Sequence, residues 1–294
     1  MPNLQLTPKT HVSSFRKIAI GTWANAYDPS VYGTLEVRMD EAMRYLAEFR
    51  ARTGRRLTVS HMMAKAAAMA LKEVPDANAV LRWNRIYLRK RIGIFFQVVM
   101  TDGGEGKTDL SGATLYDLEQ KTLLQICDEF TAKVETVRRR EDPALEGTRK
   151  TFLAVPYFAL NGLLKLISFF SFTLNLDLRW AGVPNDPFGS MMITNVGSLG
   201  LDTAYVPLVP YSRVPILLAL GAVREAPVAR DGMVAVARMM RVNATFDHRF
   251  IDGFHAGVLS RVLRDWFEHP YERFDRLDQI NATAPASSAA SAPG

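Results

Sequence analysis

The chain has 294 residues, 48% of them hydrophobic and 22% charged, a composition typical of a globular protein with a substantial core. Its net charge of +6 and pI near 9.5 favour an anionic ligand. Cys127 is the only cysteine, which excludes an intramolecular disulfide and a cysteine metal cluster. Met1–Thr10 lacks the apolar run of a signal peptide, so we expect a cytoplasmic protein.

The basic residues are spread along the chain, and only Arg89–Lys90–Arg91 and Arg138–Arg139–Arg140 form runs. Neither run has the interleaved aromatic side chains that are typical of nucleic-acid-binding surfaces. We interpret both runs as solvated faces, one at the end of a strand and one at the end of a helix. We expect no nucleic-acid partner.

Strand-like and helix-like stretches follow each other through most of the chain. After a strand at Val31–Arg38, Asp40 can cap a helix that ends at Gly54. Ser60 can cap a second helix that ends before Pro75. Three consecutive alanines in this second helix, at positions 66–68, leave little bulk on one side and favour close packing against a sheet.

The rest of the chain predicts further strands, one loop and two helices. The strands are Ile86–Arg89, Ile92–Val99, Met191–Thr194, Ile216–Val223 and Val234–Phe246. Thr101–Gly112 contains four glycines and is predicted to be a loop. Amphipathic spacing predicts a long helix over about Leu118–Arg140, and the last helix is Phe254–Phe267. Strands and helices that do not alternate strictly favour an α+β sandwich over a doubly wound fold.

Two segments differ in character from the rest. Thr151–Leu176 is strongly apolar, with Lys165 as its only charge, and has nearly the roughly 20 apolar residues that a spanning helix needs. Because Pro156, Asn161, Gly162 and Lys165 interrupt it, we favour a helix packed on the protein or on a neighbouring subunit. A helix lying on a membrane surface is the alternative. Asn281–Gly294 is uncharged and rich in Ala, Ser and Pro, so we predict a disordered tail after residue 280.

The strongest signal for chemistry is Asp247–Gly253, with the sequence DHRFIDG. A hydrophobic strand brings His248 to its end, Gly253 allows a turn, and a helix starts at once. Histidine suits proton transfer because its ordinary pKa, about 6.5, lies near neutrality. Asp252 follows four residues later and can hold the local backbone or a basic side chain. From the residues alone, a single histidine at a strand end is more often structural than catalytic.

This pattern resembles the DHRxxDG signature of the 2-oxoacid dehydrogenase acyltransferase catalytic domains. It is also similar to the HHxxxDG signature of the chloramphenicol acetyltransferases and of peptide-synthetase condensation domains, which share one fold. Asp247, in the place of the first His, favours the dehydrogenase family. Five other segments resemble that family in the same order: Thr58–Asn78, Lys90–Val99, Leu118–Leu123, Ile193–Gly197 and Val206–Gly221.

The resemblance runs from about Ser14 to Pro270 and implies one catalytic-type domain over residues 1–280 with an apolar insertion at about 150–187. The implied fold is the chloramphenicol acetyltransferase-like two-layer sandwich, a mixed β-sheet packed with helices. It also implies a homotrimer whose active site lies between two subunits, so that His248 and Thr194 come from different chains.

By this resemblance, His248 removes the proton from a thiol, either of coenzyme A or of a dihydrolipoyl group, and the thiolate attacks a thioester. Thr194 matches the hydroxyl position that donates a hydrogen bond to the tetrahedral oxyanion, where the usual residue is Ser. Asp252 completes this catalytic set in a structural role, paired with Arg16.

Two further residues, Asn195 and Gly253, are expected to support the site. Coenzyme A is expected as a substrate, with no metal, and the two basic runs are an alternative contact for its phosphates. Because we find no lipoyl domain ahead of Ser14, a separate lipoyl carrier protein is a candidate partner.

The chain also departs from the family, which leaves alternatives open. Gly103–Lys107 replaces the family's substrate-channel strand, so the acceptor stays open between a thiol and a small molecule. The competing hypothesis to a stand-alone acyltransferase is a non-catalytic trimeric scaffold or a membrane-recruited partner with the same fold.

The remaining thiol and imidazole groups are assigned no chemistry. We interpret Cys127 as a packed helical cysteine rather than a nucleophile. The spacing of His248 and His255 matches no metal template. His11, His61 and His269 are predicted to be surface or capping residues.

Overall fold

The computed structural model describes residues 2–10, 29–101, 108–138 and 156–280. Arg16, His11, residues 103–107, Arg139 and Arg140, the start of the apolar stretch at 151–155 and the predicted tail all lie outside the described residues.

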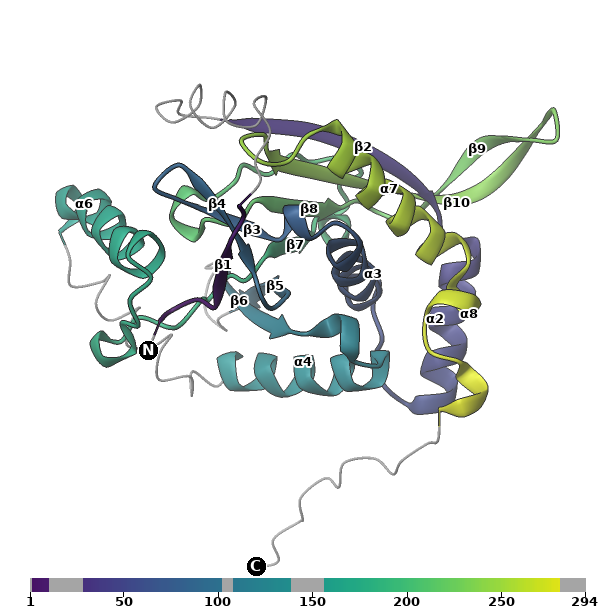
Figure 1. Cartoon of the computed structure of the whole chain (residues 1–294). Helices are drawn as coiled ribbons and strands as arrows, with labels where there is room; N and C mark the ends of the chain where they lie inside the picture. The colour runs from purple at the N-terminus through teal and green to yellow at the C-terminus, as the bar shows by residue number, and fades with distance from the viewer. Residues whose placement is uncertain (1, 11–28, 102–107, 139–155, 281–294) are drawn as a thin grey trace, which may run out of the picture.

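A mixed seven-stranded sheet forms the centre of the protein (Figure 1). The strand order is β2-β10-β8-β7-β5-β6, with β9 paired to the far end of β10; β5, β7 and β8 run parallel, and the other pairs are antiparallel. The strands are β2 Ser30–Arg38, β5 Gly93–Thr101, β6 Thr108–Tyr116, β7 Met191–Asn195, β8 Ile216–Leu220, β9 Arg224–Arg230 and β10 Met233–Asp247. A smaller sheet has the order β1-β4-β3, with β1 Leu6–Pro8, β3 Ala79–Arg82 and β4 Arg85–Arg89.

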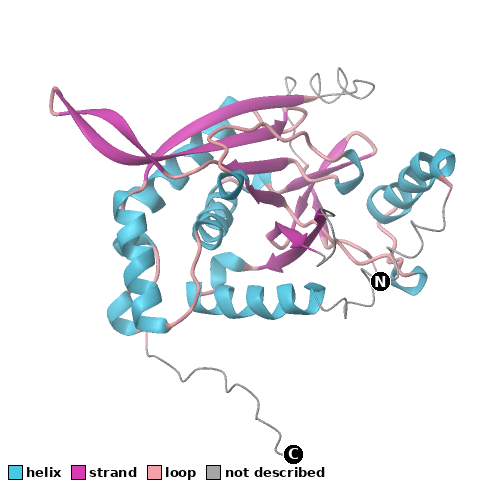
Figure 2. Ribbon diagram, turned by 180° about the vertical axis from the view of Figure 1, so that it is seen from behind, coloured by secondary structure: helices cyan, strands magenta, loops and turns pink. Residues whose placement is uncertain are grey.

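Helices cover one face of the large sheet (Figures 1 and 2). Helices α3 and α7 lie side by side over β2, β5 and β7, and α4 lies along β6. The α-helices are α2 Asp40–Thr53, α3 Val59–Glu73, α4 Leu123–Arg138, α6 Tyr157–Ser168, α7 Gly253–Glu268 and α8 Pro270–Arg273. Short helical turns are η1 Pro75–Ala77, η2 Leu118–Gln120, η3 Phe169–Thr173, which is π-helical, η4 Arg179–Ala181, η5 Val196–Leu199, η6 Pro210–Ser212 and η7 Leu277–Gln279. This arrangement confirms the predicted α+β sandwich.

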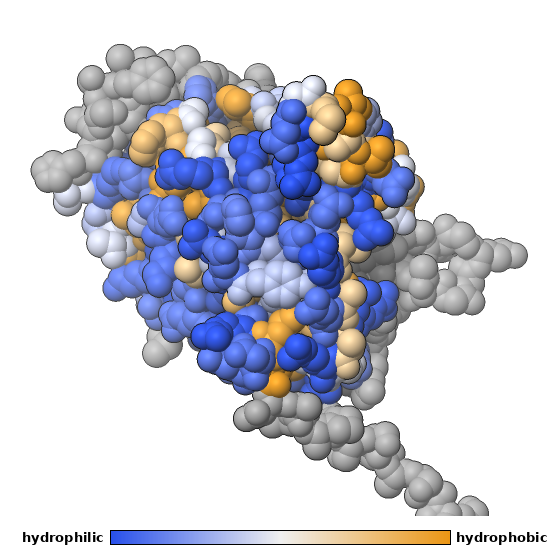
Figure 3. Space-filling view, turned by 90° about the vertical axis from the view of Figure 1, so that its right-hand side faces the viewer, coloured by the Kyte–Doolittle hydropathy of each residue, from blue (hydrophilic) through white to orange (hydrophobic). Residues whose placement is uncertain are grey.

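The central strand β8 is buried on both faces because its side chains alternate between two apolar clusters. Ile216, Leu218 and Leu220 pack into the main core under the helices, whereas Leu217 packs on the opposite face with Met192 and Val214. The alanines at 66–68 in α3 are fully buried in the main core, as their small size predicts. The outer side of the molecule near α2 and α8 is largely hydrophilic, with apolar colour limited to smaller areas (Figure 3).

Both predicted helix caps need correction. Met39 occupies the N-cap of α2, and Asp40 lies in the first turn, where its carboxylate accepts a hydrogen bond from the backbone N–H of Arg238 at 3.2 Å. Thr58, not Ser60, caps α3 by accepting a hydrogen bond from the N–H of His61. The helix begins one residue after Thr58, so Ser60 already lies inside it. Gly54 ends α2 in the left-handed conformation, as predicted.

The loop predicted at 101–112 is wrong in part, because β6 begins at Thr108 and pairs with β5 from Thr101 onward. Gly112 belongs to this strand, where the ring of Phe95 on β5 occupies the space that a Cβ atom would take. The predicted helix over 118–140 also starts later than expected. The turn η2 comes first, and Thr122 and Gln125 exchange hydrogen bonds at the start of α4. Strands β1, β3 and β9 were not predicted.

The apolar stretch forms helix α6 and the turn η3, which confirms its predicted helical character. Phe172 is fully buried with Leu4 and Val80, while Leu166 and Phe169 are 53% and 38% exposed. Within the ranges that the structure describes, no helix is both long enough and apolar enough to cross a bilayer. Burial of the exposed side chains by a neighbouring subunit stays a prediction.

Two predictions of solvent exposure are wrong. The side chain of Arg89 is only 3% exposed and pairs with Asp186 at 2.6 Å. His61 lies in the first turn of α3 and its side chain is buried, with the ring centroid 4.6 Å from that of Phe130. Because α3 begins directly after Thr58, the imidazole points into the core. The sulfur of Cys127 lies 3.5 Å from Nδ1 of His61, and burial raises the pKa of this thiol to about 12, which confirms a packed cysteine.

The buried imidazole makes stability depend on pH. Burial lowers the pKa of His61 from 6.5 to about 4, so between these values the unfolded chain binds a proton that the folded chain excludes. The contribution of His61 to the free energy of unfolding is therefore fully present above pH 6.5. It is lost as the pH drops toward 4, which lowers the free energy of unfolding by about 3 kcal/mol. We expect His61→Leu to lose this part of the acid sensitivity in urea unfolding measured across that range.

The control is His269→Leu, which removes an exposed histidine at the N-cap of α8. This variant should follow the wild-type pH dependence. An unchanged slope in His61→Leu would show that the buried imidazole does not control acid stability.

Candidate functional site

His248 lies in the turn directly after β10, the longest strand of the sheet. Backbone hydrogen bonds hold this turn from two sides. The N–H of His248 donates to the carbonyl of Pro29 at 2.9 Å, and the N–H of Asp247 donates to the carbonyl of Pro215 at 2.9 Å. These two prolines immediately precede the β2 and β8 regions that flank β10, so the turn is fixed to both neighbours of its own strand.

The imidazole of His248 is half-buried and has a defined orientation. Its Nδ1 lies 2.9 Å from the carbonyl oxygen of Ile251, three residues later. Because a carbonyl only accepts hydrogen bonds, Nδ1 carries the proton of the neutral ring. Nε2 then carries the lone pair and can accept a proton.

An arginine–carboxylate pair stiffens the same turn. The carboxylate of Asp247 is buried and accepts from Nε of Arg249 at 2.9 Å and from Nη2 at 2.6 Å. Arg213 lies nearby, and burial together with the charge of Arg249 lowers the pKa of the Arg213 guanidinium. Asp247 and Arg249, the residues on either side of His248, therefore bind each other. Their positions in the motif, one before and one after the histidine, could have predicted this ion pair from the sequence.

Asp252 begins α7. Its carboxylate accepts hydrogen bonds from the N–H groups of Phe254 at 3.0 Å and His255 at 3.3 Å, and it lies 2.6 Å from Nδ1 of His255. It therefore holds both the local backbone and a basic side chain, although this partner is His255; the predicted partner Arg16 lies outside the described residues.

Gly253 is the first residue of α7, and the turn role predicted for it is wrong. Its backbone is not left-handed, and a Cβ at this position would meet no atom within 4 Å. Nothing in the described structure explains why this position is glycine.

Thr194 and Asn195 end β7. Thr194 pairs with Ala219 of β8. Asn195 caps η5 by accepting from the N–H of Ser198 at 3.0 Å, so it shapes the chain just after Thr194. The backbone then passes so close to Gly221 that a Cβ on Gly197 would lie 2.5 Å from the Gly221 carbonyl oxygen.

The sheet keeps His248 and Thr194 of one chain apart. Thr194 pairs with Ala219, and Ala219 pairs with Asn243, five residues before His248. Strand geometry then puts His248 about 16 Å further along the sheet and about 10 Å across it, or roughly 19 Å from Thr194. A single chain therefore does not bring these two predicted site residues together.

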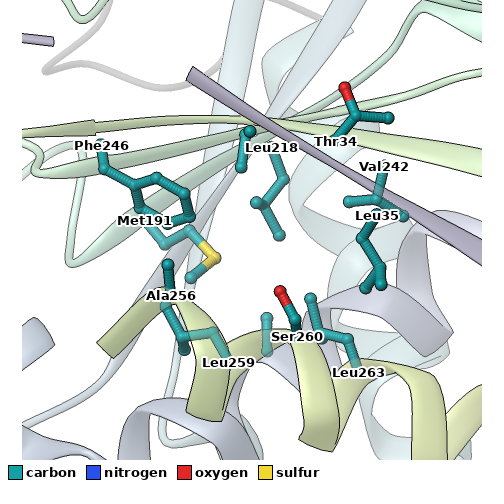
Figure 4. A pocket seen from close by; sticks show the side chains of 13 residues that line it. Thr34, Leu35, Met191, Leu218, Val242, Phe246, Ala256, Leu259, Ser260 and Leu263 are labelled. Carbon is teal, nitrogen blue, oxygen red and sulfur yellow. The ribbon is translucent and has the colours of Figure 1, made fainter. Parts of the chain in front are cut away.

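An apolar cavity of about 100 Å³ lies between α7 and the sheet (Figure 4). Met191, Leu218 and Leu259 line it, and Ser260 supplies a hydroxyl from α7. None of the predicted site residues lines this cavity. It is a gap in the core packing, and the polar side chains among its lining residues are those of Thr34 and Ser260.

The described residues contain no grouping of three or more His, Cys, Asp or Glu side chains suited to a metal ion.

Two of the groups that hold His248 are backbone carbonyls, of Pro29 and Ile251. No residue type could have pointed to them, because every residue carries a carbonyl.

The sequence of the chain is similar to that of known proteins. The model of the 2-oxoacid dehydrogenases acyltransferase catalytic domain matches residues 7–153 and 187–274. The lipoamide acyltransferase component of the branched-chain alpha-keto acid dehydrogenase complex of Bacillus subtilis is 24% identical over 239 residues, which are 80% of this chain and 46% of that protein. The acetyltransferase component of the pyruvate dehydrogenase complex of Rhizobium meliloti is 23% identical over 82% of this chain and 45% of its own length. The chain thus spans less than half the length of these curated relatives.

Solved structures show the same fold. A probable dihydrolipoamide acetyltransferase of Listeria monocytogenes superposes with a TM-score of 0.61 at 18% identity, covering 94% of this chain and 99% of that one. The dihydrolipoamide acetyltransferase of Azotobacter vinelandii gives 0.62 at 20% identity over 92% and 93%. A chloramphenicol acetyltransferase gives 0.50 at 14% identity over 90% and 100%. With the family model matched over most of its length, the chain belongs to the 2-oxoacid dehydrogenase acyltransferase catalytic-domain family.

Proposed function

We propose that the chain is an acyltransferase that moves an acyl group between coenzyme A and a thiol of the dihydrolipoyl type or a small-molecule acceptor. The observation that carries this proposal is the hydrogen bond between His248 Nδ1 and the Ile251 carbonyl. It leaves Nε2 as the proton acceptor of a rigidly held ring, which is what a general base requires.

In this mechanism, Nε2 of His248 takes the proton of the attacking thiol. The thiolate adds to the carbonyl carbon of the thioester, and the carbonyl oxygen becomes a tetrahedral oxyanion. When the intermediate collapses, the original carbon–sulfur bond breaks and the leaving thiolate takes the proton back from His248. Acyl group and proton have then changed partners, and the enzyme returns to its starting state.

Thr194 is the proposed donor to the oxyanion. In the Azotobacter vinelandii enzyme, a serine, a histidine and an asparagine four positions after the histidine are the residues named for the catalytic mechanism. Asp252 follows His248 here by the same four positions, and Thr194 keeps the hydroxyl of a serine. These matches support the assignment of His248 and Thr194 as catalytic residues and of Asp252 as the support of the turn that carries His248.

The proposed active site lies between two subunits of a homotrimer. The separation of roughly 19 Å between His248 and Thr194 within one chain supports this, because a base and an oxyanion donor must both reach the same thioester. A separate lipoyl carrier protein is the proposed partner that presents the dihydrolipoyl thiol.

One observation favours the alternative of a non-catalytic trimeric scaffold or membrane-recruited partner. The insertion leaves Leu166 and Phe169 exposed, with Trp83 stacked edge-on against Phe169. An exposed apolar patch of this kind is typical of an interaction surface. The scaffold hypothesis requires that no acyl-CoA supports transfer to any thiol.

Replacing the base tests the proposal directly. His248→Ala should lower thioester exchange between acetyl-CoA and dihydrolipoamide by about a hundredfold to ten-thousandfold, because the proton acceptor is lost. Sedimentation should show an unchanged oligomer. His269→Ala, which removes an exposed histidine, should keep wild-type turnover. Near-normal exchange in His248→Ala would contradict the catalytic role.

Replacing the hydroxyl tests the oxyanion role. Thr194→Ala should lower kcat about a hundredfold with little change in KM, since the hydrogen bond strengthens only in the transition state. Thr194→Ser should retain most of the activity because it keeps the donor. A rise in KM alone in Thr194→Ala would make this residue a binding group instead.

Mixing the two variants tests the shared site. In trimers formed by coexpressing His248→Ala and Thr194→Ala chains in equal amounts, about a quarter of the sites should combine an intact His248 with an intact Thr194. Activity should then exceed that of either variant alone by a large factor. No recovery in verified mixed oligomers would place both residues in one chain's site.

The role of Asp252 is tested through stability. Asp252→Ala removes the cap of α7 and should lower the free energy of unfolding by about 1 kcal/mol, whereas Asp252→Asn keeps an accepting oxygen and should cost less. Urea unfolding measures both. A loss of activity with unchanged stability in Asp252→Ala would indicate a catalytic carboxylate instead.

A further inference from the structure

A second pocket, of about 400 Å³ and lined by polar side chains, contains no residue of the His248 turn. The N-terminal segment 2–5, the end of β4 and the insertion form its walls. Three arginines line it, Arg89, Arg91 and Arg179, together with Tyr116, Asn185 and Asp186. Asn3 and Leu4 both bond to Asn175, which ties the N-terminal segment to the insertion (Figure 1).

The pocket contains a buried cation with unused hydrogen-bonding capacity. Nη1 of Arg89 donates to Asp186 at 2.6 Å, and the side chain is 3% exposed. Its Nε and Nη2 are buried and find no hydrogen-bond partner among the described residues. An unmet donor on a buried guanidinium is costly because it has lost its hydrogen bonds to water without replacing them. The structure therefore has a strong physical reason to accept a ligand here.

The unused edge of Arg89 is the edge that other arginines of this chain use to bind carboxylates. Nε and Nη2 of Arg91 bind Asp117, those of Arg179 bind Asp177, and those of Arg249 bind Asp247. Two parallel N–H donors match two oxygens of a carboxylate or phosphate. What fits Arg89 is therefore an oxyanion.

Asp186 adds a second requirement. Its Oδ1 is also buried and without a partner in the described part of the chain, so it needs a donor. An oxyanion that carries a hydroxyl, such as hydrogen phosphate or a 2-hydroxycarboxylate, supplies two acceptors for Arg89 and one donor for Asp186. We propose that this pocket binds a small hydroxylated oxyanion, held by the Nε–Nη2 edge of Arg89 and by Asp186.

Two further arginines at the rim of the pocket, Arg91 and Arg179, can help to attract an anion. The side chains of Arg91 and Arg179 are exposed, while their partners Asp117 and Asp177 are less so. Both guanidinium groups line the pocket and add positive charge at its rim. The buried donors of Arg89 have no contact with solvent, so the ligand displaces part of the lining as it enters.

Part of this pocket lies outside the ranges that the family model covers, whereas Arg89, Arg91 and Tyr116 lie inside them. Residues 2–5 and 179–186 lie outside the matched ranges 7–153 and 187–274. The site therefore joins Arg89 from the matched part to two segments outside it, and it shares no lining residue with the site proposed for acyl transfer.

Isothermal titration calorimetry at constant ionic strength tests the site with inorganic phosphate, lactate and acetate. We expect one site per chain for phosphate or lactate, and weaker binding of acetate, which lacks the hydroxyl. Phosphate alone would indicate a phosphate monoester, and lactate alone a hydroxycarboxylate. The absence of single-site binding by both would overturn the proposal. Because the readout is binding, the outcome does not depend on catalysis.

Arg89→Lys keeps the charge but loses the paired donors, so it should weaken binding about tenfold or more. Arg179→Gln should weaken it several-fold; the side chain is 60% exposed, and Asp177 keeps its hydrogen bond from the backbone N–H of residue 179. The matched control is Arg44→Gln, 62% exposed and paired with Glu41, which should bind like the wild type. If Arg89→Lys does not fold, Arg179→Gln decides. Equal binding by Arg179→Gln and Arg44→Gln would overturn the site.

Discussion

Strand β10 is hydrogen-bonded to β2 on one side and to β8 on the other, and this double pairing locates the turn that follows it. The pairing continues past the strand end into the bonds from His248 and Asp247 to Pro29 and Pro215. The turn thereby acquires the rigidity of the sheet. A base on such a turn needs no further ordering when it accepts a proton, which is the condition for preorganised catalysis.

The same sheet sets a limit on what one chain can do. Because β7 and β8 are parallel and in register, Thr194 stays beside Ala219, well away from the end of β10. The residues proposed for proton transfer and for oxyanion binding thus belong to opposite regions of one sheet. Under the proposed function, assembly rather than folding would complete this site, and catalysis would be coupled to oligomer formation.

The two parts of the molecule outside the family match meet each other. Asn175 of the insertion binds residues 3 and 4, and Phe172 packs with Leu4 and Val80. An N-terminal segment and an insertion about 170 residues later therefore form one local structure beside the small sheet. Arg89 and Asp186 are buried where this structure meets β4, which explains why a residue from a basic run became an interior ion pair.

Much of this protein was determined by its sequence alone. The apolar runs of β8 and β10, the amphipathic spacing of α4 and the motif around His248 are local patterns, and each predicted its element without knowledge of distant partners. The hairpin into β6 and the burial of His61 and Arg89 were decided by the tertiary structure. Each depends on a partner distant in sequence: Phe95 beside Gly112, Phe130 beside His61, and Asp186 beside Arg89. The orientation of His248 was also decided there, because the carbonyls that hold it belong to every residue type and leave no trace in the sequence.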